Sequence, residues 1–212
     1  MKLTALVLAG LLPIAASLIP MAAALPLAAA AIKAGQTAAQ DQEPATKAPA
    51  RTATARRATV IFLRHAEALP RTAGNQSPHL NDLGKARAKL QAKTLKAAGV
   101  TRVFATELHR TQETAAPLAK SLGLKVEQYR AGNSKAFANT LRDLKDGEVA
   151  LVVGHSNTVP VMVKVLGGEL TGLDKKGYLP DTQHNHMIVQ VLSSMEKGEA
   201  MRALQTLDLR IN

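Results

Sequence analysis

Basic and imidazole side chains closely follow three of the short hydrophobic segments in this chain. Arg64 and His65 end one segment, Arg110 follows a second, and His155 follows a third. In an alternating β/α chain, ligands bind at the carboxyl ends of parallel strands, near a switch in strand order. We therefore expect two guanidinium groups and two imidazoles to meet in one pocket.

These types of side chain suit phosphoryl transfer. A neutral imidazole can attack phosphorus and form a covalent intermediate. The guanidinium group of arginine makes bidentate hydrogen bonds to phosphate oxygens. Its fixed positive charge stabilises the charge that develops on the transferred group. Because arginines can perform this neutralisation, we expect no metal ion and no other cofactor.

Four segments carry a resemblance to one family. They read Leu-Arg-His-Ala-Glu at 63–67, Leu-Asn-x-x-Gly at 80–84, Thr-Glu-Leu-His-Arg-Thr-Gln-Glu-Thr at 106–114 and Val-Gly-His-Ser-Asn at 153–157. In the same order, they resemble the Arg-His-Gly, Leu-Thr-x-x-Gly, Ser-x-Leu-x-Arg-x-x-x-Thr and Gly-His segments of the histidine phosphatase superfamily, also called the phosphoglycerate mutase-like family. The resemblance covers about residues 59–192 and is nearest to the short phosphohistidine-phosphatase-like members.

This resemblance implies roles for four residues and a fold. His65 would be the nucleophile, and Arg64 and Arg110 would bind the phosphoryl oxygens. His155 would donate a hydrogen bond to the phosphoryl group and stabilise the transition state. The resemblance also implies a three-layer α/β/α sandwich and chemistry without a cofactor.

Three positions near the motifs depart from the family pattern or leave alternatives open. Ala66 replaces the usual Gly, which is tolerable if its φ is negative. Arg71 stands where many mutase-like members carry Asn, and it would either bind substrate phosphate or lie in a solvated loop. Asn157 would either donate a hydrogen bond into the pocket or cap the following helix.

The general acid of the family has no counterpart at its usual position. Many mutase-like members place a Glu shortly after the third strand, but residues 130–134 read Arg-Ala-Gly-Asn-Ser. Glu107, Glu127 and Asp82 are candidates elsewhere, and none matches the family position. This departure argues against a mutase and favours a phosphatase that acts on a good leaving group or uses a relocated acid.

Other histidines have several interpretations. The segment His184-Asn185-His186 precedes a strand and could be a partial metal-ligand set, place one imidazole on the pocket rim, or pack at a strand edge. No Asp, Glu or His partner is evident, so a metal site is the least favoured interpretation. We expect His109 to point away from Arg110, on another helix face.

Hydrophobic periodicity predicts an α/β fold from about residue 58 onward. The expected strands are 59–63, 102–105, 125–129, 148–153, 187–192 and 203–210. The expected helices are 81–98, 108–122, 134–144 and 159–166, with Asn81 as an N-cap and Gly123 as a helix end. This alternation predicts a three-layer α/β/α sandwich around a mainly parallel sheet.

The amino-terminal part reads as an appendage to that domain. Residues 1–32 begin with a positive charge and continue as a long apolar run, which is typical of a secretory signal peptide. Because the run exceeds about 15 residues, an uncleaved amino-terminal anchor is the alternative. Residues 33–57 lack large apolar side chains and are expected to be a disordered linker, with a histidine phosphatase domain over 58–212.

Composition restricts the classes of partner and site. The 212-residue chain has a formal net charge of +11, no Cys and no Trp. The lack of Cys excludes disulfides, thiolate catalysis and Cys-based metal sites. Nucleic acid is not expected, because no aromatic residues are interleaved with the basic ones. The charge indicates either an anionic partner or a soluble basic surface, and Lys85, Lys89, Lys93 and Lys96 are interpreted as a solvated helix face.

The sequence therefore predicts an exported, metal-independent phosphatase. It would hydrolyse a phosphomonoester or phosphoramidate through a phosphohistidine, in the periplasm or outside the cell, or at the membrane if the signal is not cleaved. The partner would be a phosphorylated small molecule or an envelope sugar phosphate, with the basic tail on an anionic envelope surface. The alternative is a catalytically weak or inactive phosphate-binding module of the envelope.

Overall fold

The computed structural model describes residues 55–194 and 199–211. The predicted signal segment, 1–32, and nearly all of the predicted linker lie outside the described residues. Within the ranges described, no helix has both the length and the apolar character that a membrane span requires.

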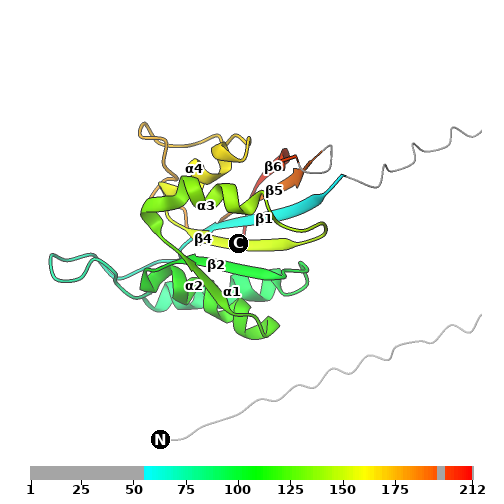
Figure 1. Cartoon of the computed structure of the whole chain (residues 1–212). Helices are drawn as coiled ribbons and strands as arrows, with labels where there is room; N and C mark the ends of the chain where they lie inside the picture. The colour runs from blue at the N-terminus through cyan, green and yellow to red at the C-terminus, as the bar shows by residue number, and fades with distance from the viewer. Residues whose placement is uncertain (1–54, 195–198, 212) are drawn as a thin grey trace, which may run out of the picture. The chain divides into compact units, whose positions relative to one another are not determined.

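Six strands and four α-helices alternate along the described chain (Figure 1). The strands are β1 (Arg57–Arg64), β2 (Arg102–Thr106), β3 (Val126–Tyr129), β4 (Val149–Gly154), β5 (His186–Ser193) and β6 (Arg202–Arg210). The helices are α1 (Asp82–Leu95), α2 (His109–Leu122), α3 (Ser134–Leu141) and α4 (Thr158–Val165), with a short 3-10 helix, η1 (Ala131–Asn133), before α3. Each expected strand and helix is present, and the largest differences are the earlier ends of α1 and α3.

The strands form one mixed sheet in the order β3-β2-β4-β1-β5-β6. β1, β2, β3 and β4 pair in parallel, but β5 pairs antiparallel with β1 and β6 pairs antiparallel with β5. The expectation of a mainly parallel sheet is therefore wrong. The reason lies after α4, where the amide of Leu179 donates to the carbonyl of Ser156 at 2.9 Å. The chain has thus returned to the carboxyl end of β4 before β5 begins, and β5 must run the opposite way.

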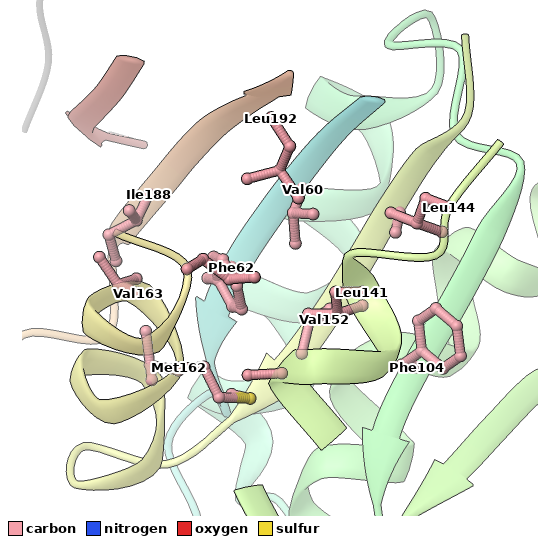
Figure 2. Close-up of a cluster of buried hydrophobic side chains, with 14 of the residues drawn as sticks. Val60, Phe62, Phe104, Leu141, Leu144, Val152, Met162, Val163, Ile188 and Leu192 are labelled. Atoms are coloured by element: carbon pink, nitrogen blue, oxygen red, sulfur yellow. The ribbon is translucent and has the colours of Figure 1, made fainter. Parts of the chain in front are cut away.

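Helices cover both faces of the sheet, as the three-layer prediction required. Alternate residues of β1 face opposite sides: Val60 and Phe62 belong to one buried cluster, and Ile61 and Leu63 to another. The first cluster includes residues of α3 and α4, and the second includes residues of α1 and α2 (Figure 1). Figure 2 shows the first cluster, where aliphatic side chains of the helices pack onto the strands; it includes Leu141, Val152, Met162, Val163 and Ile188.

The start of α1 was predicted correctly, and its buried face consists mainly of small residues. Asn81 is the N-cap, and its Oδ1 accepts from the amide of Gly84 at 2.8 Å. Leu83 and Leu90, whose spacing is typical of an apolar helix face, are 60% and 39% exposed. The buried positions are mainly small: Gly84, Ala88, Gln91, Ala92 and Leu95. Small side chains let the helix backbone approach its neighbours closely.

The carboxyl ends of β1 and β4 form the switch point of the sheet. These strands are neighbours, and Arg64 pairs with Gly154 at their last residues. From there β1 leads to α1 on one face, while β4 leads to α4 on the other. Diverging connections open a crevice between adjacent strand ends, which is where ligands bind in such sheets. The segments that carry His65 and His155 begin at this crevice.

Gly84 fixes the position of α1 against the segment that follows His65. A Cβ atom at Gly84 would lie 2.0 Å from the carbonyl oxygen of Glu67, which is closer than atoms can approach. The same carbonyl accepts a hydrogen bond from the amide of Asn81 at 3.0 Å. The close approach of the Glu67 backbone therefore explains the Gly at the end of the Leu-Asn-x-x-Gly segment.

We predict that Gly84→Ala destabilises the domain by about 1–3 kcal/mol. Ala gains about 1 kcal/mol of helix propensity over Gly, but it would push α1 off a backbone that cannot give way. Urea unfolding of the wild type and the variant measures the difference. Gly74→Ala is the matched control, because a Cβ at Gly74 meets nothing within 4 Å. Equal unfolding free energies for the two variants would contradict the prediction.

Candidate active site

A pocket of about 520 Å³ lies at the crevice between β1 and β4. Arg64, His65, Arg110 and His155 all line it, so the structure brings together the four side chains that the sequence singled out. Other lining residues come from the loop after β1, the start of α2, η1, the start of α4 and the loop after α4: Arg71, Leu108, Ala131, Gly132, Ser156, Asn157, Thr158, Asp174, Lys176, Tyr178, Leu179 and Asp181.

His65 presents an unprotonated Nε2. Its amide donates to the carbonyl of Gly154 at 2.9 Å, which anchors the residue to the end of β4. Its Nδ1 lies 2.7 Å from the carbonyl oxygen of Ala66. A carbonyl oxygen only accepts, so the ring proton is on Nδ1 and the lone pair is on Nε2. That tautomer is the one a nucleophile at Nε2 requires.

The surroundings of His65 keep its ring neutral. Burial lowers the pKa of His65 to about 2, although the hydrogen bond to Ala66 opposes this effect. His155, Arg110 and Arg64 lower the pKa further. The imidazole is therefore uncharged at neutral pH and available to attack an electrophile.

His155 lies beside His65, on the segment after β4. The two ring centroids are 5.4 Å apart at an interplanar angle of 62°. Burial lowers the pKa of His155 to about 3, and the charges of Arg110, Arg71 and Arg64 lower it further. Nη2 of Arg110 donates to Nδ1 of His155 at 3.4 Å. Both imidazoles of the pocket are thus neutral in the free protein.

The two arginines have different partners. Arg110, in the first turn of α2, donates from Nη1 to the carbonyl of Gln76 at 3.4 Å. Arg64 donates from Nη1 to the carbonyl of Pro180 at 2.9 Å and from Nη2 to Oδ1 of Asp181 at 3.1 Å. Its Nε is buried and has no partner among the described residues. Arg64 therefore has a donor left for a further acceptor.

Threonines of α2 tie the pocket segments to one another. Oγ1 of Thr114 accepts from the amide of Ala66 at 3.0 Å and lies 2.7 Å from the carbonyl of Arg110, to which it donates. This one side chain links the residue after His65 to the helix that carries Arg110. The family motif marked Thr114 by position, and the structure supplies its physical role.

Arg71 and Asn157, the two predicted substrate-binding residues, both line the pocket. Burial lowers the pKa of both Arg110 and His155, and the nearby charge of Arg71 lowers both further. Asn157 occupies the N-cap position of α4, but its side chain makes no capping hydrogen bond. The helix-capping interpretation of Asn157 is therefore wrong, while substrate binding by these two residues stays a prediction.

The His184–His186 segment lies close to the site without entering the pocket. Nδ1 of His184 donates to the carbonyl of His65 at 2.8 Å, and the two ring centroids are 5.7 Å apart. His186 is buried, and its Nδ1 lies 3.0 Å from Oδ1 of Asp208. In the part of the chain that the structure describes, no three His, Asp or Glu side chains group in a way that could hold a metal ion. His184 instead supports the backbone of His65.

None of the three carboxylates considered from the sequence as the acid lines the pocket. Oε2 of Glu107 accepts from the amide of Ala131 at 2.9 Å, beside the segment where the family carries its Glu. Glu127 pairs with Arg102, and Asp82 pairs with Lys85. Glu127 and Asp82 thus have partners outside the pocket, whereas Glu107 supports the backbone of Ala131, which lines the pocket.

Two carboxylates that line the pocket were missed. Oδ1 of Asp174 accepts from the amides of Lys176 and Tyr178 and so shapes the loop after α4. Asp181 pairs with Arg64, and its side chain is 91% exposed. No motif marks these residues, because the loop that carries them reaches the pocket only through the return of the chain after α4.

Comparison with known proteins agrees with this architecture. The family model of the histidine phosphatase superfamily, branch 1, matches residues 60–131. SixA of Agrobacterium tumefaciens, assigned as a phosphohistidine phosphatase, has a similar structure, with 18% identity, a TM-score of 0.51, and coverage of 70% of this chain and 97% of SixA. No curated protein matches the chain in sequence.

Two further solved structures share the fold. A mycobacterial glucosyl-3-phosphoglycerate phosphatase is 16% identical, with a TM-score of 0.50 and coverage of 74% of this chain and 98% of that protein. A phosphoglycerate mutase from Plasmodium falciparum is 14% identical, also with a TM-score of 0.50, and the match covers 74% of this chain and 91% of the mutase. At these identities the likeness concerns the fold.

Fold and site together define a three-layer α/β/α protein with a cationic, histidine-containing pocket at its sheet switch point. Over residues 60–131, which include Arg64, His65 and Arg110, the chain matches the histidine phosphatase superfamily. The prediction of a phosphatase of this superfamily is confirmed at the level of the family.

Proposed function

We propose that the protein is a metal-independent phosphatase that hydrolyses a phosphomonoester or phosphoramidate through a phosphohistidine at His65. The observation that carries this proposal is the unprotonated Nε2 of His65, in a pocket that Arg64 and Arg110 also line. A lone pair on nitrogen beside two guanidinium groups is the arrangement that attack on a bound phosphoryl group needs.

The reaction proceeds in two displacements. Nε2 of His65 attacks phosphorus, a P–N bond forms, and the bond from phosphorus to the leaving oxygen or nitrogen breaks with its electron pair. Arg64, Arg110 and His155 hold the three phosphoryl oxygens during this step. Water then attacks the phosphohistidine, the P–N bond breaks, and inorganic phosphate leaves with Nε2 of His65 again free.

The leaving group is one that departs with little protonation. Residues 130–134 carry no Glu at the family's position for the acid, and Glu107 is engaged with Ala131. A phosphoramidate or an activated phosphate depends less on a general acid than an alkyl phosphate does. This reasoning favours such substrates and argues against mutase chemistry.

The substrate is a phosphorylated small molecule, and we extend the proposal to an envelope sugar phosphate in which the sugar is a good leaving group. Arg71 and Lys176 also line the pocket, and neither side chain has a hydrogen-bond or ion-pair partner among the described residues. These cations suit a ligand with negative charge beyond the transferred group. An exported phosphatase would meet such ligands in the envelope.

The chemical stability of a phosphorylated enzyme identifies its linkage, because phosphohistidine survives alkali and is lost in acid. We predict that the full chain, incubated briefly with ³²P-labelled acetyl phosphate and quenched in alkali, retains label on the protein. His65→Ala abolishes the label, because the nucleophile is gone. His109→Ala is the matched control: it removes another histidine, which stacks on His79 outside the pocket, and it should label like the wild type.

The outcomes of this labelling separate the two functional hypotheses. Equal labelling of His65→Ala and the wild type would overturn the proposed mechanism. Absence of both labelling and hydrolysis of any activated phosphate, with micromolar binding of phosphorylated ligands, would instead identify the inactive phosphate-binding module.

We also propose that residues 1–32 direct export and that the basic segment 33–57 holds the protein on an anionic envelope surface. Its support is the sequence alone: a positive start, a long apolar run and a basic linker. Cell fractionation tests it. The full chain should appear outside the cytoplasm, released by salt, whereas deletion of 1–32 retains it in the cytoplasm. Cytoplasmic full chain would contradict export.

A further inference from the structure

A chain of buried hydroxyl groups connects His155 to the first turn of α2. Oγ1 of Thr106 lies 3.0 Å from Nε2 of His155 and 2.7 Å from Oγ1 of Thr111. Oγ1 of Thr111 in turn lies 2.7 Å from the carbonyl oxygen of Leu108 and 3.1 Å from that of Thr106. Both threonines have 0% exposure, so no solvent contact competes within this chain.

The two carbonyl oxygens at one end of this series of hydrogen bonds determine which atom donates in each of them. Carbonyl oxygens only accept, so the one hydroxyl proton of Thr111 is donated to the carbonyl of Leu108 or Thr106. Oγ1 of Thr111 can then only accept from Thr106, whose own proton is thereby used. Oγ1 of Thr106 is left as an acceptor, and Nε2 of His155 must donate to it.

The other side of the His155 ring agrees with this assignment through a longer contact. Nδ1 of His155 faces Nη2 of Arg110 at 3.4 Å. A guanidinium group has no acceptor, so Nδ1 carries the lone pair. Two contacts on opposite sides of the ring therefore assign the proton of neutral His155 to Nε2.

We propose that Thr106 and Thr111 are positioning residues that hold the proton of His155 on Nε2, so that His155 must gain a second proton, on Nδ1, to donate to a phosphoryl oxygen. The first half of this proposal rests on geometry alone. The second half rests on the proposed function, because it requires a phosphoryl group in the pocket beside Nδ1.

Charge in the pocket couples that second proton to the arrival of an anion. The groups that act on His155 are Arg110 from α2, Arg71 from the loop after β1, Arg64 from β1 and the neighbouring ring of His65. The loop after α4 adds charged residues to the same pocket: Asp174, Lys176 and Asp181. The nearest charges are positive, and burial together with them holds the pKa of His155 at about 3.

A bound phosphate dianion reverses this balance. It engages the arginines and places negative charge beside Nδ1, which favours the imidazolium. One proton, from solvent or from the phosphate monoanion itself, is then taken up on Nδ1 for each phosphate bound. The imidazolium keeps its Nε2 donation to Thr106 and gains an Nδ1 donation to the phosphoryl oxygen.

Thr111 is the residue that tests this relay, because Val matches its shape and lacks the hydroxyl. In Thr111→Val the hydroxyl of Thr106 loses its acceptor and becomes free to donate to Nε2 of His155. The neutral ring can then place its proton on Nδ1, because the 3.4 Å contact from Arg110 is at the outer limit of a hydrogen bond and opposes this tautomer only weakly. Thr111→Ser restores the hydroxyl. Ser121→Ala is the matched control, since it removes another α2 hydroxyl, whose one partner within the described ranges is the helix carbonyl of Leu118.

Nitrogen NMR of the free, histidine-labelled protein reads the tautomer directly, and His155→Asn assigns the signal. We expect Nε2–H for His155 in the wild type, in Thr111→Ser and in Ser121→Ala, and a substantial Nδ1–H population in Thr111→Val. Nδ1–H in the wild type, or an unchanged tautomer in Thr111→Val, would overturn the role of the threonines. The wild-type spectrum decides the first point even if Thr111→Val fails to fold.

Addition of inorganic phosphate tests the coupling. We expect both ring nitrogens of His155 to become protonated in the wild type. The high-pH limb of kcat, which reports groups in the substrate complex, should move to higher pH in Thr111→Val and return in Thr111→Ser. A neutral His155 in the phosphate complex would overturn the coupling. Failure of the phosphohistidine test would leave the tautomer result standing, so the two proposals can fail separately.

Discussion

Repulsion among the cationic groups of Arg64, Arg110 and Arg71 is the constraint that the rest of the domain must satisfy. Like charges gather in a pocket only when other interactions hold their backbones in place. Here β1 and β4 pair to their last residues, Arg64 and Gly154, and α2 is bonded to the segment after His65 through Thr114. The packing of both sheet faces thus stabilises a site that electrostatics alone would disperse, and two neutral imidazoles are the result.

The free protein relieves part of this repulsion with a contact that an incoming anion can replace. Asp181 pairs with Arg64, whose side chain is buried, but the Asp181 side chain is 91% exposed, so water screens and competes for this contact. A phosphate dianion offers Arg64 two acceptor oxygens in a buried setting, where such bonds are stronger. The Asp181 contact is therefore weak enough for substrate to displace, while it keeps the guanidinium of Arg64 in place beforehand.

Local signals predicted most of the fold, because the N-cap at Asn81, the αL glycine at Gly123 and the alternating strands act over a few residues. They failed where the outcome depended on the path of the chain. Nothing between α4 and β5 indicates that the loop returns to the carboxyl edge, so the sheet direction and the pocket position of Asp181 were not predicted. Likewise, the four motif residues of the pocket could be named from the sequence, but the tautomer of His155 depends on hydrogen-bond partners that only coordinates supply.

The most direct test of the account is a crystal structure of the protein with orthovanadate, which mimics a phosphoryl group under attack. The account predicts vanadium bonded to Nε2 of His65, with its oxygens within hydrogen-bond distance of Arg64, Arg110 and Nδ1 of His155, and with Arg64 released from Asp181. Vanadate bonded to another histidine, or bound with Arg64 and Arg110 out of reach, would contradict it.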